Sequence, residues 1–307
     1  MTASVRVPSD PLQQEDSLLA FPEILDARAL RQSIDAFVDS LVINYADDLE
    51  RISMPLLKFL VFVEQLLRDT PWWLVIAIIA AVSWYGSRRW TLTAGVTVLL
   101  LFIGAIGQWD RGMQTLALMI VSLVMCVLIG IPTGILMSVS ERFRKIMLPI
   151  LDIMQTMPTF VYLIPVVMLF GLGKVPALIA TIVYAVPPLI RLTDLGIRLV
   201  DHSVMEAATA FGATKRQKLL GVQLPLALPN ILAGINQTTM MALAMVVVAS
   251  MIGARGLGQE VLAGINRLEV GRGLLAGLAI VALAVIFDRV TQSYGKRLQY
   301  PAVKDGD

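Results

Sequence analysis

The chain has 307 residues, of which 57% are hydrophobic and 16% charged, and its formal net charge is only +2. A mean hydropathy of +0.75 means more apolar side chain than one soluble core can bury. This excludes an ordinary soluble protein and places most of the chain in lipid. With one cysteine, Cys126, and one histidine, His202, an intrachain disulfide is excluded and a metal centre or catalytic triad is disfavoured. We therefore expect no catalytic residue, no metal ligand and no nucleic-acid partner.

The first 70 residues form an acidic tail, with six Lys or Arg against twelve Asp or Glu, whereas the remainder carries nineteen against eleven. Apolar residues recur at helical spacing over 34–52 and again over 54–68, which predicts two amphipathic helices. Two roles remain open for these helices: they lie in the outer membrane interface, or they brace the first membrane span. We expect the tail to be an accessory, so that deleting residues 1–50 leaves assembly intact.

Seven stretches of the chain are predicted to cross the membrane, because each is a long and predominantly apolar run. Continuous apolar runs without period-two alternation favour helices over a barrel. The predicted fold class is therefore an all-α integral membrane protein with about seven transmembrane helices. The predicted spans are 71–87, 91–108, 113–138, 146–171, 175–190, 226–252 and 274–290.

Basic residues concentrate in alternate connections between these spans. Fourteen Lys and Arg fall in one set of connections, which includes the segment after the last span, and only five fall in the opposite set. The positive-inside rule places the richer set in the cytoplasm, so we expect the N-terminus outside and the C-terminus inside.

Several polar side chains lie inside the predicted spans, where they are costly unless they are used or paired. They are Asp152, Gln155, Thr156, Asn236, Gln237 and Thr238. Two interpretations stay open, because such residues either line a pathway through the membrane or join helices by hydrogen bonds. Gly130 with Gly134, and Gly273 with Gly277, have the small-xxx-small spacing that is typical of close helix packing, and a dimer seam is the minor alternative.

A polar segment at 201–225 separates two apolar regions and predicts a helix-turn-helix. Ser203 followed by Glu206 matches a capping box that begins the first helix, and Gly212 can take the left-handed conformation that ends it. Ala207 and Ala208 keep this helix narrow enough to enter a groove on a partner. The plainer interpretation is a capped loop whose basic residues only fix topology.

The second helix of this segment is predicted to begin at Thr214, because Gln217 repeats the capping-box spacing. Pro225 and Pro229 are expected to close it.

The segment resembles the EAA loop by which permease subunits of ATP-binding-cassette importers engage their ATPase subunits. The residues that carry the resemblance are Ser203, Glu206, Ala207, Ala208, Gly212, Leu224 and Pro225. Over about 109–295 the chain looks like the ProW-type permeases that import glycine betaine and proline betaine. The motifs are Gln155-Thr156-Met157-Pro158, Val161-Tyr162-Leu163, Pro187-Pro188-Leu189-Ile190-Arg191-Leu192, Asn236-Gln237-Thr238, Ala249-Ser250-Met251-Ile252 and Gly256-Leu257-Gly258-Gln259.

The resemblance implies a multi-pass protein of the bacterial cytoplasmic membrane in a type I (MetI-like) importer. Its partners would be a second copy of the chain, two cytoplasmic ATPase subunits that hold ATP and Mg²⁺, and an external substrate-binding protein. It also implies a division into an acidic extracytoplasmic tail at 1–70, two accessory spans at 71–108, a five-span permease core at 109–295 and a cytoplasmic tail at 296–307. No cofactor is expected on this chain.

The implied solute is glycine betaine, proline betaine, choline or carnitine, moved by alternating access. An aromatic face toward the quaternary ammonium adds Phe160 and Tyr162 to the candidate pathway residues. Two other classes of transport protein remain as alternatives, an ion-coupled secondary transporter and an osmotically gated channel.

Overall fold

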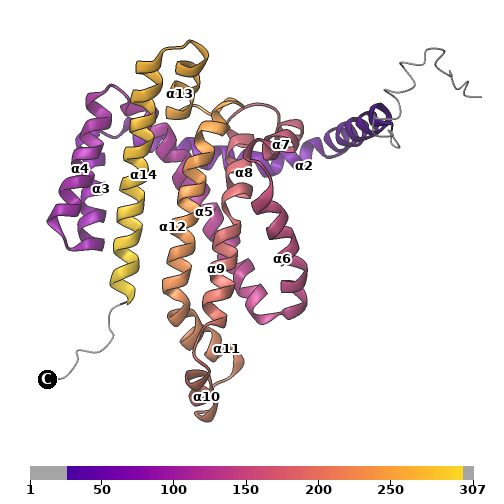
Figure 1. Ribbon diagram of the computed structural model, residues 1–307, viewed down its shortest axis with the longest axis vertical. Coiled ribbons are helices and arrows are strands. Elements are labelled where there is room, and N and C mark those ends of the chain that lie inside the picture. Colours follow the sequence, from indigo (N-terminus) through magenta and orange to yellow (C-terminus); the bar gives the residue numbers. More distant parts are fainter. Residues whose placement is uncertain (1–25, 300–307) are drawn as a thin grey trace, which may run out of the picture. The chain divides into compact units, whose positions relative to one another are not determined.

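The computed structural model describes residues 26–299, and its regular structure within that range is helical throughout (Figure 1). Contacts divide the chain into residues 1–46 and 47–307. Residues 1–25 of the predicted tail at 1–70, and residues 300–307 of the predicted tail at 296–307, lie outside the described residues. The domain boundaries given above remain predictions.

Helix α2 (Ala27–Asp69) occupies the region where two amphipathic helices were predicted. Asp26 begins it by accepting hydrogen bonds from the backbone N–H groups of Arg28 and Ala29. The predicted break near residue 53 is wrong, because the helix continues through Pro55. Two helices are nonetheless present, because they join at a kink where Tyr45 has non-helical backbone (φ −118°, ψ 17°), so the break lies there and not near residue 53. A proline removes one hydrogen bond and bends a helix without necessarily ending it, so the apolar pattern alone could not place the break.

Three apolar helices follow: α3 (Trp72–Ser87), α4 (Trp90–Ala105) and α5 (Trp109–Val139). They confirm the first three predicted apolar helices, although α3 and α4 have only 16 residues each and are shorter than a full span. Helices α3 and α4 pack on one another and on α14 (Val270–Gln299).

The predicted continuous span at 146–171 is wrong. It is built from α6 (Glu141–Thr156), the 3₁₀ turn η1 (Thr159–Tyr162) and α7 (Leu163–Phe170). The axis bends by 114° between the two halves. Pro158 explains the break, because a proline pushes the preceding residue toward extended backbone, and Met157 has ψ 134°.

The next predicted span, 175–190, is too short. Helices α8 (Lys174–Ala185) and α9 (Pro187–Arg198) together form one membrane-crossing segment that ends at Arg198. The charged residues after Ile190 appeared to end the apolar run. Asp194 is nonetheless buried and paired, so the helix continues past it.

Helices α12 (Leu224–Ser250), α13 (Leu257–Asn266) and α14 complete the bundle. Among the described residues, four helical segments are long and apolar enough to cross a membrane, and up to six if each bent helix pair is one span. This is fewer than the seven spans that the sequence predicted, and α4 is apolar but shorter than these segments.

The largest core cluster is shared by α5, α8 and α12, with Val121, Leu178 and Met245 among its fully buried members. Glycine permits the closest approach in this core: a Cβ at Gly134 would lie 2.7 Å from the backbone oxygen of Ile190. This confirms close packing for the Gly130 and Gly134 pair. At Gly277 a Cβ would meet nothing within 4 Å, so the prediction of close packing is wrong there.

Candidate functional site

The predicted helix-turn-helix is present, and its first helix is α10 (His202–Ala210). Its N-cap is Asp201, whose carboxylate accepts a 2.8 Å hydrogen bond from the backbone N–H of Ser203. That hydrogen bond holds the pKa of Asp201 below its ordinary value. The predicted Ser203 and Glu206 capping box is therefore wrong, since Ser203 is already inside the helix. Glu206 instead lies 3.2 Å from Nδ1 of His202.

The turn after α10 confirms two of the local predictions. Gly212 has φ +79°, the left-handed conformation that glycine adopts without steric cost. Thr214 and Gln217 form a reciprocal capping box at the start of α11 (Lys215–Lys218). The ammonium of Lys218 reaches back to the Thr209 hydroxyl at 3.1 Å and joins the two short helices.

The prediction that Pro225 and Pro229 close the second helix is wrong. A π turn, η2 (Leu219–Gln223), leads from α11 directly into α12, so 215–250 forms one helical segment. Pro225 lies at the junction of η2 and α12 and Pro229 lies inside α12, and neither ends the helix.

Helix α10 and the turn after it project beyond the ends of α9 and α12 (Figure 1). No residue of α10 is buried, and Ala207 is exposed. Phe211, which directly follows the helix, is 92% exposed. A large aromatic side chain this exposed at the tip of a polar loop is available for contact with a partner, since aromatic residues are enriched at protein interfaces.

A second feature is an open polar pocket of about 360 Å³ between α6, α9 and α12. It brings Gln155 of α6 and Gln237 of α12 to the same space. Arg191, which lines it as well, forms an ion pair with Asp152. Three of the predicted pathway residues are thus gathered at this pocket, two directly and one through its arginine partner.

Comparison with known proteins identifies the kind of protein that carries this loop and pocket. The family described as "Binding-protein-dependent transport system inner membrane component" matches residues 126–300, more than half of the chain. The chain belongs to this permease family.

Two curated relatives extend the similarity beyond that core. The chain is 48% identical over 261 residues to the glycine betaine/proline betaine transport system permease protein ProW of Escherichia coli, covering 84% of this chain and 73% of ProW. It is 43% identical over 268 residues to the glycine betaine transport system permease protein OpuAB of Bacillus subtilis, covering 86% of this chain and 93% of OpuAB. The resemblance drawn from the sequence motifs is confirmed.

Among solved structures, the permease is similar to a chain of an inward-facing MetNI methionine ABC transporter, with a TM-score of 0.50 and 26% identity. The alignment covers 60% of this chain and 90% of that chain. This confirms the predicted MetI-like type I importer fold for the permease core.

The remaining predicted pathway residues lie away from the polar pocket. The Tyr162 hydroxyl donates to the backbone oxygen of Met154, and its ring meets Tyr184 edge-on at 5.7 Å. Asn236 donates to Asp288 of α14 at 3.1 Å. The side chain of Thr156 bonds its own helix, Phe160 is 58% exposed, and Thr238 is buried.

Sequence reasoning missed Asp194, the buried acid that lines the pocket. Its carboxylate accepts hydrogen bonds from Arg144 at 2.9 Å and Arg198 at 2.8 Å. Arg198 also pairs with Glu141 and donates to the backbone oxygen of Met137. The network joins the α5–α6 connection to α9. A signal was present, because Asp194 is an acid just past the predicted span, with Leu192, Leu195 and Ile197 nearby in the sequence.

A second network lies at the other end of the permease, where the Gly256-Leu257-Gly258-Gln259 motif begins α13. Glu260 is largely buried and pairs with Arg111 at 2.8 Å and Arg272 at 2.7 Å. The hydrogen bond from Arg272 holds the pKa of Glu260 below its ordinary value. The N–H of Leu257 donates to the Thr115 hydroxyl, so α13 is fixed to α5 as well as to α14.

Proposed function

We propose that this permease imports glycine betaine or a related quaternary ammonium solute, such as proline betaine, choline or carnitine, and that ATP hydrolysis on partner subunits drives it. The family assignment and the names of the similar permeases support the class of transport. Helix α10 supports the mode of energy coupling, because it offers an unburied docking surface at one end of the bundle. Family membership favours this proposal over an ion-coupled transporter or an osmotically gated channel.

The assembly that we propose contains two copies of this chain, two cytoplasmic ATPase subunits holding ATP and Mg²⁺, and an extracytoplasmic substrate-binding protein. Each ATPase subunit would receive one α10 helix, with the Phe211 ring in an apolar groove. Ser203, Glu206, Ala207, Ala208 and Gly212 shape this helix, while Leu224 and Pro225 connect it to α12. Since α11 and α12 form one helical segment, a displacement of the tip would be transmitted along α12 into the bundle.

We propose that the polar pocket belongs to the translocation pathway. Gln155 and Gln237 supply amide donors suited to the carboxylate of a betaine. The Arg191 ion pair with Asp152 stands beside them and can open or re-form as the helices move. Phe160 offers an exposed aromatic face for the ammonium group.

The other predicted pathway residues remain part of this proposal in a supporting role. Oδ1 of Asn236 and Oγ1 of Thr238 are buried without a hydrogen-bond partner in the described part of the chain. Each such atom costs about 1–3 kcal/mol, which favours a partner in another state of the transport cycle. Thr156 and Tyr162 would fix the bend between α6 and α7, since both bond backbone oxygens near the break.

Uptake by proteoliposomes tests this proposal. The chain is reconstituted with its cognate ATPase and binding protein, and entry of labelled glycine betaine is measured with and without ATP. We expect uptake to require ATP and all components, and excess unlabelled choline, carnitine and proline betaine to rank the related solutes by competition.

One variant and its control test whether α10 couples the permease to the ATPase. Phe211→Ala should lower ATPase association and uptake by about tenfold or more, because truncating a central aromatic anchor typically costs about 2 kcal/mol. Leu172→Ala is the matched control, since Leu172 is 74% exposed but lies in the α7–α8 connection. Undiminished uptake without ATPase subunits would refute the proposal, and equal effects of the two variants would remove the coupling role of α10.

A further inference from the structure

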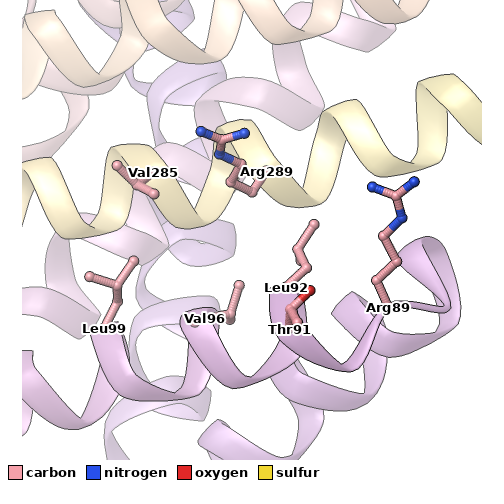
Figure 2. A pocket seen from close by; sticks show the side chains of 8 residues that line it. Arg89, Thr91, Leu92, Val96, Leu99, Val285 and Arg289 are labelled. Carbon is pink, nitrogen blue, oxygen red and sulfur yellow. The ribbon is translucent and has the colours of Figure 1, made fainter.

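A groove of about 360 Å³ that the transport proposal does not use lies between α4 and α14. Figure 2 shows two arginines on its walls, Arg89 at the start of α4 and Arg289 on α14. Neither guanidinium forms an ion pair or a hydrogen bond with any residue in 28–295. Two cationic groups that share a groove without an acidic partner create an electrostatic preference for an anion.

The rest of the groove is apolar. Leu99 and Val285 line the end away from Arg89, as Figure 2 shows, and Leu92 lies between the two ends. The neighbouring faces of α4 and α14 expose apolar side chains, including Val98 at 63% and Val281 at 56%. In a membrane such faces contact lipid chains. The occupant must therefore combine a negative group with a long apolar part and be reachable from the bilayer.

The groove has free space at Gly95. A Cβ at Gly95, which lines the groove, would meet nothing within 4 Å. The helix has no packing need for glycine here, although alanine is the better helix former by about 1 kcal/mol. A larger side chain at this position would fill the groove without changing its charge.

We propose that this groove binds an anionic phospholipid, with the phosphate between Arg89 and Arg289 and one acyl chain along the apolar lining. Arginine is well suited to this role, because its planar guanidinium presents paired donors to phosphate oxygens. The lipid would hold the accessory helix α4 against α14, the last helix of the permease core.

Native mass spectrometry of the purified full-length chain, in whatever assembly it forms, tests the proposal. The probes are phosphatidylglycerol, phosphatidylcholine with the same acyl chains, and inorganic phosphate. We expect phosphatidylglycerol to bind at least tenfold more tightly than phosphatidylcholine. In the double variant Arg89→Gln with Arg289→Gln the affinity for phosphatidylglycerol should fall about 25-fold, because each basic residue near an anionic headgroup contributes about 1 kcal/mol.

Matched variants separate this groove from general surface charge. Arg88→Gln removes a neighbouring arginine that does not line the groove, and Gly95→Ala adds one methyl group, so both should bind phosphatidylglycerol like the parent. Gly95→Leu and Gly95→Trp keep both arginines but fill the groove. Both should bind phosphatidylglycerol more weakly than the parent, and the tryptophan variant should bind it most weakly. Equal binding of the two lipids, or parental affinity in both the arginine double variant and Gly95→Leu, would overturn the proposal. Displacement of phosphatidylglycerol by millimolar inorganic phosphate would do the same.

Discussion

At the scale of single residues, three buried acids of this permease form ion pairs between helices inside an otherwise apolar core. Glu64, Asp194 and Glu260 each have a side chain that is less than a tenth exposed, and each accepts from at least one Lys or Arg on another helix. Removing one partner of such a pair leaves a charge with neither water nor counter-ion, and this penalty exceeds the net stabilisation of the intact pair. The acids therefore fix which helices meet.

Glu260→Gln should destabilise the permease at neutral pH by about 1–3 kcal/mol, because it removes a carboxylate that pairs with Arg111 and Arg272. The folded-state pKa of Glu260 is lowered from its ordinary value of 4.5, so the stabilisation is present above that value and is lost as the pH falls through the folded-state pKa. Thermal unfolding of the parent and of Glu260→Gln is measured in detergent between pH 7 and pH 3. The difference in stability between them should shrink below about pH 4.5. A constant difference over this range would contradict the assignment.

Gly134→Ala should cost about 1–3 kcal/mol, because its new methyl group would approach the Ile190 backbone oxygen at 2.7 Å and the Thr193 Cβ at 2.5 Å. Gly277→Ala is the matched control, since it makes the same change within helix α14 where the space is open. Chemical or thermal denaturation of the two variants should show a loss only for Gly134→Ala. Equal stability would mean that α5 and α9 can separate without penalty.

At the scale of helices, the sequence predicts where apolar segments lie but not how each one ends. Apolar runs located α3, α4, α5, α12 and α14, because side chains that face lipid or core are apolar throughout. The bend after Thr156 was missed although Pro158 was visible, because a proline inside a membrane helix either kinks it or ends it, and only packing decides. The extension of α9 was missed because the partners of Asp194 come from distant positions in the sequence.

The candidate site shows the same limit. Gly212 and the Thr214 capping box could be predicted, because their signals are local. The helix start could not be settled locally, since Asp201 and Ser203 are both good capping residues and the structure uses Asp201. Which polar residues share the pocket depends on three helices from separate parts of the chain, so Gln155 and Gln237 could not be distinguished from Asn236 in advance.

Truncation of the N-terminal region separates its two predicted roles. Deleting residues 1–46 removes one contact-defined unit and should leave the folded permease intact. Deleting residues 1–69 should destabilise it, because Leu60 is 2% exposed in the main core and Glu64 pairs with Lys174 at 2.6 Å. Size-exclusion chromatography and thermal unfolding measure both outcomes. Loss of the folded protein on the shorter deletion would show that the tail is more than an accessory.

At the scale of the whole molecule, the two charge networks stand at opposite ends of the helical bundle. The Asp194 network lies at the end that carries α10, and the Glu260 network at the end that carries α13 (Figure 1). In the orientation predicted from the basic residues, the first faces the ATPase and the second faces the solute-binding protein. An alternating-access cycle needs each end to open in turn, so these networks are suited to close one end at a time.

Cysteine labelling tests that orientation. Cys126 is buried, so single cysteines introduced elsewhere can be labelled against little background. Arg267→Cys, in the exposed turn after α13, should react with a membrane-impermeant maleimide in intact spheroplasts. Lys215→Cys, at the start of α11, should react only after permeabilisation. Labelling of Lys215→Cys from outside would reverse the topology and remove α10 from the cytoplasm.

The bare ring of Phe211 also bears on how cells regulate the amount of this permease. In the proposed assembly, a permease chain made in excess of its ATPase would leave the Phe211 ring exposed in the cytosol, and chaperones and quality-control proteases recognise such exposed apolar groups. Its abundance should then follow the supply of the ATPase, so that balanced subunit stoichiometry arises from turnover of the orphan as well as from balanced synthesis.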